Sequence, residues 1–206
     1  MHIIAILSGK GGAGKTTLAV HLGVAAETAG HTTAIIDLDP QASALTWKDK
    51  REQETPAVVS AQASRLPQLL KAAEDSGADI VFIATAPHSE AAGLAAARVA
   101  ELVLIPCRPA ILDLHAIEST VEITRLADVP ALAVLNAVPA RTTLAEEART
   151  AISTYNVPTA PQQIGQCIAY VHALTAGLTA QEYEPKGKAA AEMQALYTYI
   201  AKQIGV

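Results

Sequence analysis

The chain has little cysteine and few aromatic residues. Its 206 residues include two Cys, one Phe and one Trp, whereas half of all residues are apolar. Cys107 and Cys167 are too few and too far apart for a zinc site, and a cytosolic chain keeps such thiols reduced. We therefore expect a sizeable core built from Ala, Val, Leu and Ile rather than from aromatic side chains or metal.

Long apolar runs and linkers are also missing. The longest apolar runs have the length of a strand, well short of the roughly 20 residues needed to span a bilayer, and no charged-then-apolar leader precedes them. We find no internal repeat and no linker rich in Pro, Gly or Ser. These absences predict one cytoplasmic domain over residues 1–206, neither exported nor embedded in a membrane.

Strand-like and helix-like segments alternate along the whole chain. Such alternation predicts right-handed crossovers and an α/β fold, a single doubly wound, mainly parallel sheet with helices on both faces. The expected strands are 2–8, 32–37, 57–60, 79–84, 101–106, 131–136 and 158–163. The expected helices are 15–29, 41–52, 64–75, 88–98, 112–126, 143–154, 166–175 and 187–204.

A phosphate-binding loop lies between the first strand and the first helix. Residues 9–17 read GKGGAGKTT and contain the spacing G-x-x-x-x-G-K-T. In such a loop the backbone N–H groups turn toward phosphates, Lys15 reaches the β and γ oxygens, and the Thr16 hydroxyl ligates Mg²⁺. The residues predicted to bind a nucleotide here are Gly11, Gly12, Ala13, Gly14, Lys15, Thr16 and Thr17.

Lys10 makes the loop more specific. An ordinary loop of this type needs no lysine there, so Lys10 is either a solvated charge or points toward a phosphate bound by a second subunit. Residues 10–17 resemble the deviant Walker A box of the ParA/MinD superfamily, in which this lysine crosses an ATP-sandwich dimer. The resemblance implies an ATPase of the P-loop fold, with ATP and Mg²⁺ as cofactors, Lys10 and Lys15 as catalytic residues, and a homodimer in the ATP state.

Two carboxylates follow the second expected strand. Residues 35–43 read IIDLDPQAS, and because Pro40 ends the strand, Asp39 becomes a loop residue and can face the phosphates together with Asp37. The segment is similar to the hhhDxDPQ stretch of ParA-type ATPases. That similarity implies that Asp39 orients or deprotonates the attacking water and that Asp37 helps near Mg²⁺. The alternative is that Asp39 caps a helix beginning near Gln41.

A third motif lacks its carboxylate. Residues 79–87 read DIVFIATAP and resemble the Walker B strand hhhhDTAP of the same superfamily, except that Ala84 replaces the expected aspartate. Outer-shell groups of this kind change metal affinity or activity by roughly 10- to 100-fold when they are lost. Either the lineage has abandoned hydrolysis, or the aspartate was replaced to hold the ATP state. Retention of every other active-site element favours an engineered replacement, and we expect impaired hydrolysis.

Two further segments are similar to the superfamily. Residues 104–113 resemble the proline-bounded loop and Asp-containing helix start that form part of the ParA dimer face, although Asp113 could simply cap a helix. Residues 133–136 resemble the strand whose terminal Asn lies near the adenine. Asn136 is therefore expected to bind the nucleotide, with a turn residue as the alternative.

The signals for DNA binding conflict. Short ParA proteins often carry an arginine after the last strand, where basic residues help the ATP dimer hold DNA without sequence preference; this position is Cys167 here. The formal charge is −5, so attraction to phosphate requires local clusters of cations. The candidates, which could equally be ordinary exposed charges, are Lys48, Lys50 and Arg51, and Arg141, Arg149, Lys186 and Lys188.

The resemblance, which covers nearly the whole chain and fits the short ParA type without a helix-turn-helix, implies a function. It implies a cytoplasmic, nucleoid-associated ATPase that dimerises on ATP, binds non-specific DNA and positions a plasmid or protein compartment. A ParB-like or other cargo adaptor would stimulate hydrolysis, and no membrane would be involved. One alternative, favoured by Ala84, is a non-hydrolysing nucleotide-bound scaffold or conjugation accessory factor. Another is a reductase like the nitrogenase iron protein, although Cys107 looks like a core residue at a strand end.

Overall fold

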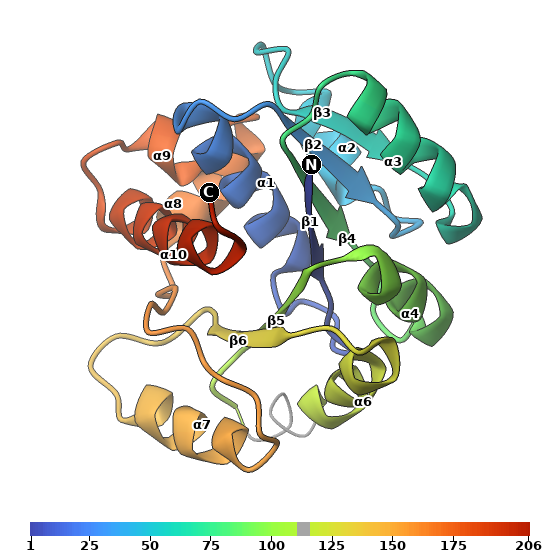
Figure 1. Ribbon diagram of the computed structural model, residues 1–206. Coiled ribbons are helices and arrows are strands. Elements are labelled where there is room, and N and C mark those ends of the chain that lie inside the picture. The colour runs from blue at the N-terminus through green and yellow to red at the C-terminus, as the bar shows by residue number, and fades with distance from the viewer. Residues whose placement is uncertain (111–115) are drawn as a thin grey trace.

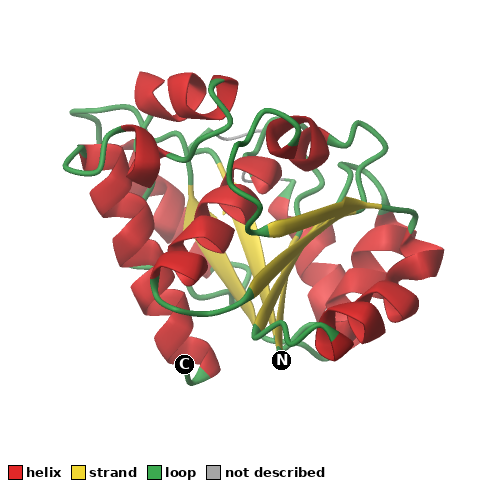
Figure 2. Ribbon diagram, turned by 90° about the horizontal axis from the view of Figure 1, so that it is seen from above, coloured by secondary structure: helices red, strands yellow, loops and turns green. Residues whose placement is uncertain are grey.

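A six-stranded parallel sheet forms the centre of the molecule, with helices on both of its faces (Figures 1 and 2). The computed structural model describes residues 1–110 and 116–206. The sheet has the order β3-β2-β4-β1-β5-β6, and each neighbouring pair is parallel. This arrangement confirms the predicted α/β fold class. The strands are β1 His2–Ile6, β2 Thr33–Asp37, β3 Ala57–Ser60, β4 Ile80–Ala84, β5 Leu102–Cys107 and β6 Ala131–Leu135.

Alternating strand residues enter two separate cores. In β1, Ile4 and Ile6 join one core, whereas Ala5 and the following Leu7 join the other. Because both faces are covered, the central strands read as continuous apolar runs rather than as alternating ones. The first core includes helices α1 Lys15–Thr28, α2 Ser43–Lys48, α8 Ile168–Thr175, α9 Ala180–Tyr183 and α10 Lys188–Ile204. The second includes helices α3 Leu66–Asp75, α4 Glu90–Val99, α6 Ile117–Ala127 and α7 Leu144–Ser153.

One edge of the sheet gathers the sequence motifs. Parallel strands end at the same edge, and ligands of open α/β sheets bind outside these carboxyl ends. The phosphate-binding loop follows β1, the acidic loop follows β2, and Ala84 ends β4. Since β2, β4 and β1 are adjacent in the sheet, the three motifs meet there.

The prediction of a seventh strand over residues 158–163 is wrong. Only Thr159 forms a bridge, with Ala133 of β6. Pro158 and Pro161 flank this bridge, and proline has no N–H to donate to a strand ladder. The segment therefore lies along the edge of the sheet without becoming a strand.

Helix boundaries also differ from the prediction. The helix expected over 41–52 is the shorter α2, and a 3-10 turn, Ala63–Arg65, precedes α3. Helix α9, which begins with a capping box between Thr179 and Glu182, is not among the predicted helices. Asp113 lies outside the described residues. In the described ranges, no helix is long and apolar enough to cross a bilayer.

Candidate functional site

The phosphate-binding loop has the backbone geometry that its glycines predict. Gly12 and Gly14 adopt left-handed conformations, with φ of +73° and +103°. A Cβ on Gly14 would lie 2.0 Å from Nδ2 of Asn136, so a side chain there would have to displace Asn136. Gly14 is the N-cap of α1, which directs the unpaired N–H groups of the first helical turn toward the loop. An anion would find both these donors and the positive end of the helix dipole.

Lys15 lies inside this loop. Its side chain is buried, and its Nζ donates hydrogen bonds to the carbonyl oxygens of Ser8 at 3.2 Å and Lys10 at 3.3 Å. Burial lowers the pKa of Lys15, and the nearby carboxylates of Asp39 and Asp37 partly oppose that effect. The side chain of Lys15 thus folds back onto the start of the loop, close enough to the acidic motif to feel both carboxylates.

Asp37 organises the acidic loop. Its carboxylate is buried, and its oxygens accept N–H groups from Asp39 at 3.0 Å and from Ala44 at 2.9 Å. Burial raises the pKa of Asp37, against the lowering effect of these two hydrogen bonds. The carboxylate therefore ties the end of β2 to the first turn of α2. The role of Asp37 near Mg²⁺ stays a prediction. The carboxylate would have to fill that role while it also accepts the N–H groups of Asp39 and Ala44.

Asp39 faces a cavity shared with the phosphate-binding loop. It follows β2 as a loop residue and accepts the N–H of Gln41 at 3.0 Å. It does not cap α2, because the N-cap of that helix is Ala42. The cavity has a volume of about 450 Å³. Its lining consists of Gly11, Gly12, Gly14, Lys15, Thr16, Thr17, Asp39, Ser43, Thr46, Trp47, Lys50, Pro87 and Leu174.

One face of α2 and the turn after it supply residues that were not predicted to line this cavity. Ser43, Thr46, Trp47 and Lys50 all line the cavity. Their spacing of three, four and seven residues places them on one side of a helix. That spacing could have been recognised from the sequence next to the acidic motif.

A second cavity, of about 470 Å³, lies on the other side of the same loop and shares Gly12, Gly14 and Thr17 with the first. Asn136 lines it together with Arg108, Cys167 and Tyr170. The amide of Asn136 is already engaged, because Nδ2 donates to the Ala13 carbonyl at 2.7 Å and Oδ1 accepts the Ala137 N–H at 2.9 Å. Asn136 thus braces the phosphate-binding loop, and contact with a base stays a prediction.

Ala84 is the last residue of β4 and is buried between two strands. Its register partners are Asp37 on β2 and Ile6 on β1. Neighbouring strands lie about 4.8 Å apart, and paired residues point to the same face. A carboxylate at position 84 would therefore stand directly beside that of Asp37.

The remaining predicted residues occupy different environments. Thr16 and Thr17 lie half-buried in the first turn of α1, and Lys10 lies half-buried in the loop. Among the cations proposed for DNA contact, the Arg51 side chain is only 4% exposed and ion-pairs with Glu182. The prediction that Arg51 is a surface cation is therefore wrong, because its side chain is almost completely removed from solvent.

The structure also separates the other basic candidates. Lys48 donates to the carbonyl oxygens of Gln53 at 2.8 Å and Glu54. Arg149 donates to the carbonyl oxygens of Ala160 at 2.7 Å and Pro161 at 3.1 Å. Of these candidates, the ones that are exposed are Lys50, Arg141, Lys186 and Lys188.

The two cysteines pack against different cores of the fold. Cys107 is buried at the end of β5 as expected, whereas Cys167 is the half-buried N-cap of α8. Within the described residues, no three His, Cys, Asp or Glu side chains converge as a metal site. The geometry offers no support for an iron–sulfur centre held by both thiols.

Comparison with known proteins identifies the class to which this site belongs. The CobQ/CobB/MinD/ParA nucleotide-binding domain matches residues 4–187. The maintenance of carboxysome distribution protein A of Gloeobacter kilaueensis is 31% identical over 98% of this chain and 93% of its own length. Protein ParA of Rhizobium radiobacter is 32% identical over 55% of this chain and 51% of its own length.

Solved structures show the same fold at lower identity. The septum site-determining protein MinD from Pyrococcus horikoshii, complexed with Mg-ADP, superposes with a TM-score of 0.79. The two sequences are 20% identical, and the match covers 99% of this chain and 97% of that chain.

Proposed function

The chain belongs to the CobQ/CobB/MinD/ParA nucleotide-binding family, and we propose that it is a ParA-type ATPase that positions a cargo, with residues 1–206 acting as one domain. The observation that carries this proposal is the shared cavity. Lys15, Thr16 and Asp39, which come from two separate motifs, line the same space beside the N-terminus of α1. Phosphate-binding donors and a carboxylate able to orient water therefore stand together.

The residues present fit ATP with Mg²⁺. Loop amides from Gly11 to Thr17 surround the phosphates, and Lys15 exchanges its two carbonyl partners for the β and γ oxygens. The Thr16 hydroxyl would be a metal ligand, since Mg²⁺ prefers hard oxygen donors. When bound, Mg²⁺ supplies charge neutralisation at the phosphates. Asp39 orients the attacking water, and Asn136 keeps the loop in shape through Ala13.

Hydrolysis is slow in this chain. Ala84 cannot accept a hydrogen bond where the motif provides a carboxylate, so the groups that orient Mg²⁺ and its water are incomplete. Asp37, the neighbour of Ala84 in the sheet, already holds two backbone amides. Binding of ATP depends on the loop amides, Lys15 and Thr16, which Ala84 does not alter, and therefore survives.

ATP binding assembles a two-fold dimer in the cytoplasm. The support is Lys10, which stands at the family's signature position in the loop, and the family membership itself. The dimer binds nucleoid DNA without sequence preference, and a ParB-like or other adaptor stimulates release. The carboxysome-distribution protein and ParA among the relatives support a role in distributing a cargo.

A second candidate function rests on Ala84. A chain that binds ATP and does not turn it over could act as a nucleotide-bound scaffold, with its dimer as the lasting form. Partner-stimulated turnover separates the two candidates, because a scaffold gains no rate from an adaptor.

The test compares ATP turnover in the parent chain with that in Ala84→Asp and in Ala84→Asn, a control of similar shape without charge. We expect Ala84→Asp to raise turnover by roughly 10- to 100-fold, since it restores an outer-shell carboxylate. Ala84→Asn should stay near the parent rate. Failure of the parent to bind ATP in calorimetry would refute the proposed function. Equal and measurable turnover in all three proteins would instead show that Asp37 and Asp39 suffice, whereas ATP binding without turnover in any of them would favour the scaffold.

A further inference from the structure

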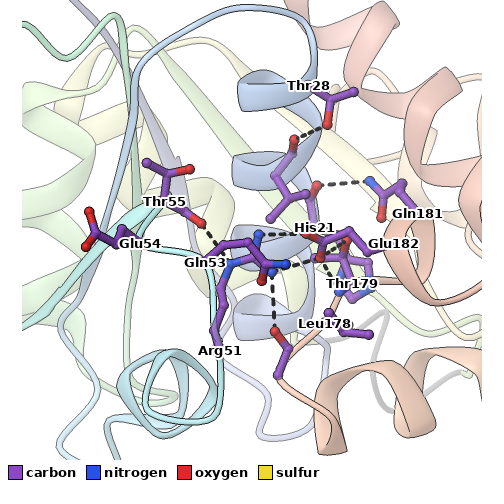
Figure 3. Close-up of polar contacts among 12 residues, drawn as sticks. His21, Thr28, Arg51, Gln53, Glu54, Thr55, Leu178, Thr179, Gln181 and Glu182 are labelled. Carbon is purple, nitrogen blue, oxygen red and sulfur yellow. Dashed lines mark hydrogen bonds and ion pairs between the residues drawn. The ribbon is translucent and has the colours of Figure 1, made fainter.

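A partly buried contact joins the turn after α2 to α9, far from it in sequence (Figure 3). Arg51 Nη1 and Nη2 donate to the two carboxylate oxygens of Glu182 at 2.8 and 2.7 Å. Nε of the same arginine donates to the Thr55 carbonyl at 2.7 Å, and its guanidinium lies 5.0 Å from the ring centre of Trp47. A bidentate Arg–carboxylate contact fixes the orientation of the two side chains as well as their distance.

Trp47 extends this contact to the nucleotide cavity. Its Nε1 donates to the Leu178 carbonyl at 3.0 Å, and its ring lines the cavity beside Lys15 and Thr16. We name Trp47, Arg51, Leu178 and Glu182 the α2–α9 clamp. The clamp therefore has one side in the nucleotide cavity and the other on α9.

Glu182 is fixed on the α9 side. Its Oε2 also accepts the N–H and the hydroxyl of Thr179, at 2.8 and 3.0 Å. Burial would raise the pKa of Glu182, but the hydrogen bonds from Arg51 and Thr179 outweigh burial and lower it. Gln181, one residue earlier, donates to the carbonyl of His21 on α1 at 3.1 Å. The clamp is thus connected to the helix that begins at the phosphate-binding loop.

The backbones also approach closely at this place. Gly177 has φ of +71°, and a Cβ added there would lie 2.4 Å from the Lys50 carbonyl oxygen. Any side chain at position 177 would push the segment after α2 away from the segment before α9. Gly77 has a similar φ of +77° but nothing within 4 Å of an added Cβ. It is therefore a matched control.

Helix α2 depends on attachments at both ends. It has six residues, far fewer than an isolated helix needs to be stable in water. Asp37 holds its first turn through the N–H of Ala44, and the clamp holds its end. The loop with Asp39 lies immediately before α2, so the placement of the helix sets the placement of that loop.

We propose that Arg51 and Glu182 are positioning residues, which fix α2 and thereby hold Asp39 at the nucleotide cavity. This inference rests on the proposed ATPase function for its consequence, although the mechanical link can be tested without nucleotide. Loosening the clamp should free residues 38–46 selectively and should let nucleotide escape faster, while the phosphate-binding loop itself is unchanged.

The first measurement is hydrogen exchange of the protein without nucleotide. In Gly177→Ala and Glu182→Gln, the amide hydrogens of residues 38–46 should exchange about tenfold faster than in the parent, because each change weakens the contact that holds the end of α2. Gly77→Ala and Glu74→Gln, an exposed carboxylate paired with Lys71, should match the parent. Unchanged exchange in 38–46, or equal acceleration over the whole chain, would overturn the proposal. If Gly177→Ala does not fold, Glu182→Gln decides.

The second measurement uses nucleotide and the one tryptophan of the chain. ATP with Mg²⁺ should change the emission of Trp47 in the parent and in Gly77→Ala, and this change should shrink in Gly177→Ala and Glu182→Gln. A fluorescent ATP analogue should leave these two variants about tenfold faster. Equal release rates in all variants would overturn the positioning role. A parent that binds no nucleotide would refute the proposed function instead, and the exchange data would still decide whether the clamp holds α2.

Discussion

His21 should make the stability of the fold depend on pH between 7 and 5. The side chain is fully buried on α1, and its Nδ1 donates to the Thr17 carbonyl at 2.7 Å. Its Nε2 has no hydrogen-bond partner among the described residues, and the ring lies edge-on to Tyr170 at 5.2 Å. Burial lowers the pKa of His21 from 6.5 to about 4, although the nearby Glu182 carboxylate works in the opposite direction.

The sign and size of the effect follow from these two pKa values. Between pH 6.5 and about pH 4 the unfolded chain binds a proton on His21 and the folded chain does not. The contribution of neutral His21 to the free energy of unfolding is therefore fully present above pH 6.5, and it decreases as the pH drops toward 4. Integrating the difference gives a loss of about 2 kcal/mol by pH 5 and roughly 3 kcal/mol by pH 4.

Urea unfolding at pH 7 and pH 5 tests this prediction. Other groups also titrate in that range, so the informative quantity is the difference between the parent and His21→Leu, in which the titrating ring is gone. We expect the free energy of unfolding of the parent to drop by about 2 kcal/mol more than that of His21→Leu. His172→Gln, which removes an exposed ring on α8, should behave like the parent. Parallel losses in the parent and His21→Leu would refute the reasoning.

Three further outcomes are expected. ATP with Mg²⁺ should convert the parent to a dimer in sedimentation experiments but leave Lys10→Ala monomeric; equal dimerisation would contradict the role assigned to this lysine. Cys167→Arg should strengthen ATP-dependent DNA binding and steepen its salt dependence by about 0.9 in log–log slope for each added phosphate contact, and an unchanged binding curve would count against a DNA surface there. Gly14→Ala should abolish nucleotide binding in calorimetry, because its Cβ would lie 2.0 Å from Asn136. The control is Gly30→Ala, since Gly30 has a φ of +98° but nothing within 4 Å of an added Cβ. Retained affinity in Gly14→Ala would show that the loop can shift.

The parts of the fold that local patterns determine could be predicted. β1, the glycine loop and α1 follow from an apolar run, a glycine spacing and a helical period that all lie within residues 2–29. The end of β2 at Asp37 likewise follows from Pro40, which cannot continue a ladder. For these elements neighbours in sequence are sufficient.

Other elements depended on weaker or non-local signals. The capping box from Thr179 to Glu182 is visible in the sequence and could have indicated α9. The pairing of Glu182 with Arg51 could not have been found, because 131 residues separate the two partners and each is an ordinary charge by itself. Asn136 was correctly placed at a strand end, but its bond to Ala13 depends on the contact of two loops.

The segment beside β6 has a consequence for how copies of this chain can associate. A sheet edge with free N–H and C=O groups invites another strand to add to it. Here Thr159 bridges Ala133, and the segment contains Pro158 and Pro161, which offer no N–H to an incoming strand. The sheet is thereby protected from growing on this side into continuous multi-chain sheets. On this side of the sheet, association of two copies is instead left to loop and helix surfaces, which can separate again without unravelling the sheet.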